Sequence, residues 1–140
     1  MEFNVMFADA PNEYGEVYSR ETLEGAITGA RARSNIYNVN VPLLMNEATA
    51  LEVYDGISLS NIAGTCKKIY FDKAENCVKA DIEFAGKNGD ILKEMKNSNV
   101  SFGVSTTMVD GNIHSFYVNP TKQQNSKFVS SFDDALEEEF

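Results

Sequence analysis

The sequence predicts a single α+β domain of about six strands and two helices, and two observations lead to this prediction. In residues 100–108, apolar or β-branched side chains alternate with serine, glycine and threonine, which is the period of a strand. At Leu23, Ala26, Ile27 and Ala30 the apolar spacing is that of an amphipathic helix. A length of 140 residues suits one domain with a sizeable core.

The first strand is predicted at residues 3–7, where apolar and polar side chains alternate. Proline and glycine break the pattern in residues 11–15. A helix is then predicted over residues 20–33, because the Ser19 hydroxyl can accept from the free amides of its first turn. The apolar stripe of this helix is narrow, so we expect the helix to lie on one side of a sheet.

The middle of the chain predicts a central strand and a hairpin. Residues 39–45 are apolar enough for a central strand, with a strand end or bulge near Pro42, because proline cannot donate a ladder hydrogen bond. Residues 46–61 lack a convincing period and predict a loop with a short helical turn. Residues 62–71 and 77–84 flank a turn, and the clean alternation of the second segment predicts an antiparallel hairpin.

The next part predicts a short helix and a second hairpin. Asp90 is a candidate N-cap for the helix. Three apolar residues are expected on its buried side: Ile91, Leu92 and Met95. The strand at residues 100–108 is expected to return at residues 113–118, because Asp110-Gly111 supplies the positive φ angles of a tight turn.

The domain is predicted to span residues 1–118, followed by a polar and acidic C-terminal arm at residues 119–140. Phe132, Leu136 and Phe140 would share one face if the arm were helical, and they are the candidate partner-binding residues. Two interpretations stay open at this point, a disordered tail and a peptide that binds a partner.

The net charge of −9 makes nucleic acid and anionic membranes unfavourable partners, and it suits an outer surface. No apolar run approaches a membrane span and the N-terminus lacks the features of a signal peptide, so we expect a soluble protein made in the cytoplasm. Cys66 and Cys77 match no metal or redox spacing and are expected to be buried free thiols. No cofactor motif is present in the sequence.

The hydroxyl side of residues 100–108 raises the question of a serine nucleophile, because Ser105 lies in it. Serine hydrolysis needs a base, and His114 is the one histidine of the chain. A two-residue turn at 110–111 would place His114 opposite Thr107 and Ser105 opposite Phe116. His114 would then be at best a diagonal neighbour of Ser105, and from chemistry alone enzymatic activity is doubtful.

Six segments follow one another in a distinctive order: Asn-Glu-Tyr-Gly-Glu-Val-Tyr-Ser at 12–19, Leu-Glu-Gly-Ala-Ile at 23–27, Leu-Met-Asn-Glu at 44–47, Cys-Val-Lys-Ala-Asp-Ile at 77–82, Asn-Gly-Asp-Ile-Leu at 88–92 and Phe-Gly-Val-Ser at 102–105. In this order they resemble the prohead proteases of tailed bacteriophages, over roughly residues 3–108. In that family the last segment reads L-G-V-S-S-R-G, and the first of its two serines is the nucleophile, which corresponds to Ser105 here.

The chain departs from the family at the site itself. The family histidine in G-E-L-N-H-P is matched by Glu47, with Ala48 in place of the proline, so Ser105 is retained without its base. A carboxylate of ordinary pKa is a poor acceptor for a serine proton at neutral pH. Residues 106–108 also replace the family's Ser-Arg-Gly. The resemblance implies a small, mainly antiparallel β-barrel or curled sheet with flanking helices, similar to herpesvirus assembly proteases.

The resemblance therefore implies an inactive homologue that serves as a virion component, an auxiliary, decoration or cement protein on the capsid. Its expected partners are the major capsid protein or other head proteins, with self-association as a further option. Two alternatives stay open. One is an active head-maturation protease that uses Ser105 with His114, for which residues 136–138 would be a processing site. The other is an internal scaffold or core protein that leaves after assembly.

Overall fold

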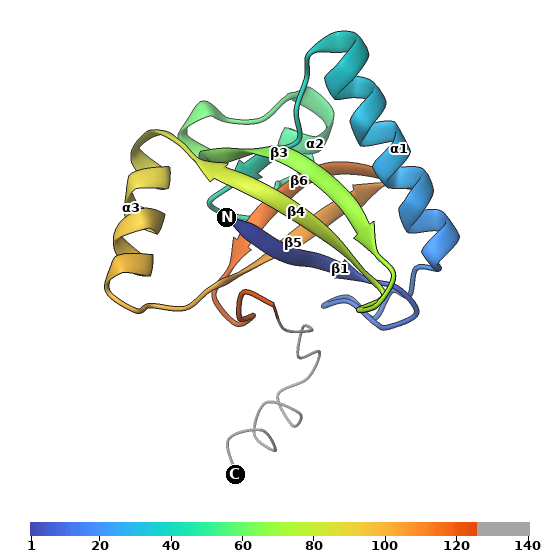
Figure 1. Ribbon diagram of the computed structural model, residues 1–140. Coiled ribbons are helices and arrows are strands. Elements are labelled where there is room, and N and C mark those ends of the chain that lie inside the picture. The colour runs from blue at the N-terminus through green and yellow to red at the C-terminus, as the bar shows by residue number, and fades with distance from the viewer. Residues whose placement is uncertain (126–140) are drawn as a thin grey trace.

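The computed structural model describes residues 1–125, which form an α+β domain built on one six-stranded sheet. The strand order is β1-β4-β3-β2-β6-β5, and the sheet curls until β1 lies against β5, which gives a nearly closed barrel (Figure 1). The strands are β1 (Glu2–Phe7), β2 (Pro42–Leu44), β3 (Ile62–Asp72), β4 (Cys77–Phe84), β5 (Gly103–Val109) and β6 (Asn112–Asn119). The helices are α1 (Arg20–Tyr37), α2 (Ala50–Asp55) and α3 (Gly86–Asn97), with a 3-10 turn, η1 (Leu59–Asn61).

Helix α1 begins where the sequence predicts and runs four residues further. The hydroxyl of Ser19 accepts a hydrogen bond from the Thr22 amide at 3.2 Å, as expected of an N-cap. Asn38 ends the helix with a positive φ of 57°. The apolar stripe is buried as predicted: Leu23, Ala26, Ile27 and Ala30. This stripe packs α1 against β3 and β6.

Strand β2 is short, and this explains where α1 sits. The strand begins at Pro42, so the predicted strand end at this proline is confirmed. β2 pairs antiparallel with residues 62–65 of β3 and parallel with β6, which makes the sheet mixed. The later half of β3 extends beyond β2, and α1 packs along the opening between β3 and β6.

The hairpin of β3 and β4 is confirmed, with Asn76 at a positive φ of 56° in its turn. Cys66 and Cys77 are buried, free thiols as predicted. Burial raises the pKa of each thiol to about 11. Both cysteines are therefore protonated, weakly nucleophilic core residues at neutral pH.

The predicted N-cap of the third helix is wrong. Helix α3 begins at Gly86, after Ala85 at the N-cap position, and Asp90 lies inside the helix. Gly89 permits this earlier start, because a Cβ there would lie 2.9 Å from the backbone carbon of Phe84. The prediction that Ile91 lies on the buried side is wrong, because this residue is 47% exposed, whereas Leu92 and Met95 pack on the core as predicted.

The segment between β2 and β3 has more helix than the sequence predicts. Helix α2 carries a capping box, in which the Thr49 hydroxyl accepts from the Glu52 amide and the Glu52 carboxylate accepts from the Thr49 amide. Hydrogen bonds lower the pKa of Glu52, first that from the Ser58 amide and then that from the Asn61 side chain. Glu52 thus connects α2 to η1 through hydrogen bonds. The helix forms here although its sequence has no periodic apolar pattern.

The barrel interior is filled by aromatic and aliphatic side chains. Phe3, Phe84 and Phe102 form a cluster with ring centroids 5.9 to 6.2 Å apart. These rings come from β1, the end of β4 and the residue before β5, so they join the two edges of the curled sheet. No helix within residues 1–125 has both the length and the hydropathy needed to cross a membrane.

The chain stays packed on the barrel beyond β6. Lys122 is 4% exposed. Its carbonyl oxygen packs against Gly103, where an added Cβ atom would lie only 2.6 Å from that oxygen. The Asn4 side chain donates to the carbonyl oxygen of Asn125 at 3.2 Å. Residues 119–125 of the predicted arm are thus held on the domain. Phe132, Leu136 and Phe140 lie outside the described residues.

Candidate functional site

Ser105 lies in the middle of β5 and its side chain is enclosed, with 3% of the residue exposed. Its hydroxyl oxygen accepts a hydrogen bond from the Asn119 amide nitrogen at 2.9 Å. The carboxylate of Glu13 lies beside this hydroxyl, and its interaction with Ser105 lowers the pKa of Glu13. An acceptor site of the hydroxyl is therefore engaged by Asn119, and Glu13 is its neighbour on the cavity side.

His114 is not next to Ser105. The predicted register of the second hairpin is wrong beyond its turn, because a β-bulge falls between Thr107 and Met108. His114 is the extra residue of this bulge, so Ser105 lies opposite Tyr117 instead of Phe116. His114 is three residues, about 10 Å, from Tyr117 along β6.

The His114 ring has other partners. Its Nδ1 atom forms a 2.8 Å hydrogen bond with the hydroxyl of Ser115. Burial lowers the pKa of His114, and the nearby charge of Arg33 lowers it further. The structure therefore does not bring the alternative base to Ser105.

Glu47, which occupies the position of the family histidine in the resemblance, lies near the site but is directed elsewhere. Its carboxylate accepts a hydrogen bond from the Tyr14 hydroxyl. This hydrogen bond, with burial and the charge of Glu47, raises the pKa of Tyr14 to about 12. The Glu47 charge also raises the pKa of Glu13, so Glu47 and Ser105 both neighbour Glu13.

Glu13 is a site residue that the sequence reasoning missed. It lies in the loop between β1 and α1, and burial is the main cause of its raised pKa. The hydrogen bond from Ser105 and the charge of Lys122 act in the opposite direction. Glu13 is part of the Asn-Glu-Tyr-Gly segment, but nothing in its spacing relates it to Ser105.

Lys122 is the second missed residue, and it closes the gap between the two edge strands. Its ammonium nitrogen donates to the carbonyl oxygens of Asn4 in β1 and Val104 in β5, each at 2.8 Å. The Thr106 hydroxyl adds a 3.1 Å hydrogen bond to the carbonyl oxygen of Val5. Burial lowers the pKa of Lys122 to about 8, although the charge of Glu13 opposes this shift.

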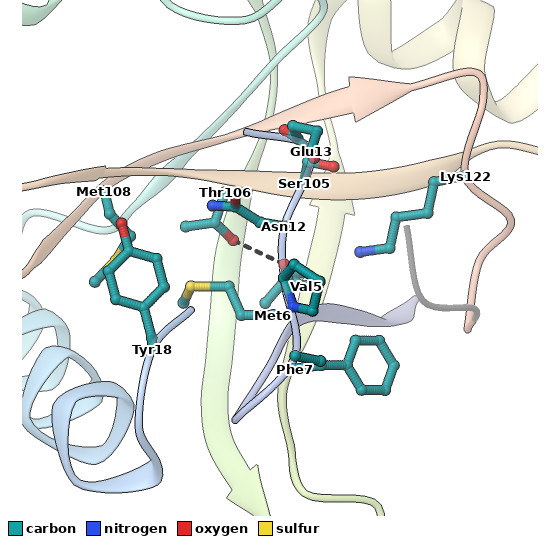
Figure 2. A pocket seen from close by; sticks show the side chains of 12 residues that line it. Val5, Met6, Phe7, Asn12, Glu13, Tyr18, Ser105, Thr106, Met108 and Lys122 are labelled. Carbon is teal, nitrogen blue, oxygen red and sulfur yellow. Dashed lines mark hydrogen bonds between the residues drawn. The ribbon is translucent and has the colours of Figure 1, made fainter. Parts of the chain in front are cut away.

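These groups surround a small cavity of 40 Å³ between the Glu13 loop, β1 and β5. Figure 2 shows Glu13 and Ser105 close together, with Lys122 entering from one side and Met6, Tyr18 and Met108 from the other. A water molecule needs about 10–15 Å³ on this measure, so the cavity has room for a few waters and not for a peptide.

A wider surface cleft of 340 Å³ lies beside the cavity, and Ser105 does not line it. Its walls include Glu13, Tyr14, Glu47, Tyr117 and Thr121. A peptide in this cleft would meet carboxylates and tyrosine rings, and not the candidate nucleophile. Within residues 1–125, no three histidine, cysteine or acidic side chains gather as a metal site.

The chain matches no protein-family model, and neither the curated proteins nor the solved structures contain a match to it.

Proposed function

We propose that this protein is a non-catalytic structural virion protein that binds a bacteriophage capsid as an auxiliary or decoration protein. The main observation against catalysis is the burial of Ser105 and the set of side chains around its hydroxyl. This hydroxyl is buried and accepts a hydrogen bond from Asn119, and its other neighbour is the carboxylate of Glu13, while His114 forms a hydrogen bond with Ser115. The capsid part rests on the resemblance of the ordered segments to prohead proteases.

The chemistry of the site supports the non-catalytic proposal further. A general base must lie within about 3.2 Å of the proton that it takes, directly or through one water. Glu13 neighbours the Ser105 hydroxyl, but a carboxylate is a weak base toward a serine hydroxyl and cannot later act as an imidazolium would. Lys122, a second titratable group of the cavity, donates hydrogen bonds to two backbone carbonyl oxygens. The cluster is therefore suited to hold β1, β5 and the Glu13 loop together.

The surface supports a binding role. Several large apolar side chains are exposed on the segment of α2 and η1, among them Tyr54 at 83% and Leu59 at 85%. Others lie at the C-terminal end of α1, Ile36 and Tyr37, and just after the helix, Val39. Figure 1 shows the end of α1 and the α2 segment on the same upper side of the molecule. Exposed apolar groups of this kind are typical of protein-binding surfaces.

The two alternative functions, an active protease and an internal scaffold or core protein, require different properties of the molecule. An active protease that pairs Ser105 with His114 would need the β-bulge of β6 to rearrange, since His114 is displaced along the strand. An internal scaffold or core protein would leave the particle during assembly, and no feature of residues 1–125 favours it over a decoration protein.

The deciding experiment is the quantification of the intact chain, full length to Phe140, in purified mature virions by mass spectrometry. We expect many uncleaved copies per particle. If the protein is present in proheads and missing from mature heads, the scaffold alternative replaces the proposal. If it is trimmed near Leu136, the protease alternative is tested by head-protein cleavage with a Ser105→Ala variant.

A further inference from the structure

A basic groove runs between α1 and the part of β3 that extends beyond β2. It has a volume of 290 Å³ and contains three of the 12 basic side chains of the chain, Arg31, Lys67 and Lys68. Its apolar wall is formed by Ala30, Val41, Cys66 and Ile69. The protein as a whole carries a net charge of −9, so a concentration of positive charge at this place is unusual for the molecule.

The cations of the groove are poorly neutralised. The Arg31 guanidinium donates to the carbonyl oxygen of Ile69, at 3.1 Å from Nε and 2.8 Å from an Nη atom. Within residues 1–125, neither Arg31 nor Lys68 has a carboxylate oxygen within 4 Å, and Lys67 has only the exposed Glu83 at 3.5 Å. Lys79, by contrast, has three carboxylates within 4.0 Å.

The groove continues past Arg31 into a second hollow of 370 Å³. Arg31 lines both hollows, and the second one adds the apolar and aromatic side chains of Ile27, Tyr70 and Phe71. It also contains Thr28 and Glu24, whose carboxylate is paired with Arg20 at 3.0 Å. The complete surface therefore offers positive charge next to aliphatic and aromatic groups. An acidic peptide with aromatic or leucine side chains fits this chemistry.

The C-terminal end of the same chain has this composition. Residues 132–140 read Phe-Asp-Asp-Ala-Leu-Glu-Glu-Glu-Phe, with five acidic residues, no basic residue and three large apolar side chains. Five of the 21 acidic residues of the protein thus lie within nine positions. The charge of this segment complements that of the groove.

The segment is also long enough to reach the groove from the last described residue. Asn125 is held next to Asn4 in β1, which pairs with Lys79 in β4, which in turn pairs with Tyr70 in β3. Two strand spacings amount to about 10 Å. Residues 126–131 can span up to about 20 Å when extended.

We propose that residues 132–140 bind the groove between α1 and β3 of their own chain, with the carboxylates on Arg31, Lys67 and Lys68. The tether keeps the local concentration of the segment in the millimolar range, so weak individual contacts suffice. This inference does not depend on the capsid role, because it concerns the free protein alone.

Zero-length carbodiimide cross-linking of the full-length protein, followed by mass spectrometry, tests the proposal. We expect Glu137, Glu138 or Glu139 to be joined to Lys67 or Lys68 with a yield about tenfold higher than to other lysines, as a local millimolar concentration predicts. Lys87 and Lys93, exposed on α3, are the matched controls. An even yield across these lysines would overturn the proposal.

A mixture of unlabelled and ¹⁵N-labelled protein distinguishes the chain's own tail from that of a second copy. Cross-links within one isotope class support the proposal, and cross-links between classes overturn it in favour of an exchange between copies. A second readout uses the full-length variant with Glu137→Gln, Glu138→Gln and Glu139→Gln. Its amide resonances should shift at residues 30–35 and 66–69 and stay in place on α3, and unchanged resonances at the groove would contradict the proposal.

Discussion

The ammonium nitrogen of Lys122 lies 2.8 Å from the carbonyl oxygen of Asn4, a residue 118 positions earlier in the chain. The same nitrogen donates to Val104 at 2.8 Å. Asn4 belongs to β1 and Val104 to β5, the two strands at the ends of the sheet order. One buried side chain thus joins the barrel where the backbone ladder does not.

Lys122→Met should show how the charge of this side chain affects stability. The folded protein lowers the pKa of Lys122 from 10.5 to about 8, so between these pH values the folded state binds fewer protons than the unfolded state. The contribution of Lys122 to the free energy of unfolding is therefore smallest below pH 8 and grows as the pH rises toward 10.5. We expect the free energy of unfolding of the wild type relative to Lys122→Met to increase by about 2 kcal/mol between pH 7.5 and pH 10.

Urea denaturation of both proteins at several pH values measures this difference. The raised pKa values of Cys66 and Cys77 act in the opposite direction above pH 9. The effect of Cys66 cancels in the comparison, whereas the pKa of Cys77 depends on the charge of Lys122, so both proteins are compared in a Cys77→Ala background. A difference that stays constant from pH 7.5 to pH 10 would show that Lys122 does not titrate in this window.

Ser105 should not react with a fluorophosphonate probe, because its hydroxyl is buried and lacks a strong base. Labelling of the wild type should equal that of Ser105→Ala, measured by intact-protein mass spectrometry. The variant should also be less stable by about 1–2 kcal/mol, since the Asn119 amide loses its acceptor. Stoichiometric labelling of Ser105 would contradict the non-catalytic proposal.

Gly103→Ala should displace residues 122 and 123 from the barrel. A Cβ at this position would lie 2.6 Å from the carbonyl oxygen of Lys122 and 2.9 Å from that of Gln123. We expect a loss of about 1–3 kcal/mol in thermal or urea unfolding. Gly25→Ala is the matched control, because no atom lies within 4 Å of its Cβ and alanine should stabilise α1 by about 0.5–1 kcal/mol. Equal effects of the two substitutions would argue against tight packing of this turn.

Tyr54→Ser and Leu59→Ser should reduce binding to phage heads without altering the fold. Both side chains are more than four-fifths exposed, so their replacement should change the free energy of unfolding by no more than about 0.5 kcal/mol. Co-sedimentation with heads that lack the protein measures the binding. Ile91→Ser and Val100→Ser, which alter exposed apolar residues elsewhere, are the controls and should bind normally. Equal loss in all four variants would indicate nonspecific adhesion.

The sequence predicts most of the elements because their signals are local. The stripe of α1, its Ser19 cap and the hairpin of β3 and β4 depend on neighbouring residues and are confirmed. The start of α3 could not be predicted from Asp90, because it depends on close packing of Gly89 against Phe84. The β-bulge at His114 could not be predicted either. A turn fixes the pairing register of two strands only as far as the next irregularity in either strand.

The candidate site was predicted only in part. Ser105 was identified because it lies in a strand of distinctive pattern, and its neighbour Asn119 begins the segment that the sequence assigns to the arm. Glu13 and Lys122 could not be found, because a lysine in a polar segment gives no signal that it will be buried. Their proximity to Ser105 arises from the curl of the sheet, which brings together residues 13, 105 and 122.

The position of Lys122 near the end of the chain has a consequence for synthesis. The first strand emerges from the ribosome more than a hundred residues before the side chain that fastens it. Contacts between such distant residues carry a large loop-closure cost and form slowly. The nascent chain can pair β3 with β4 early, whereas the two hydrogen bonds by which Lys122 holds β1 to β5 can form only after residue 122 has been translated.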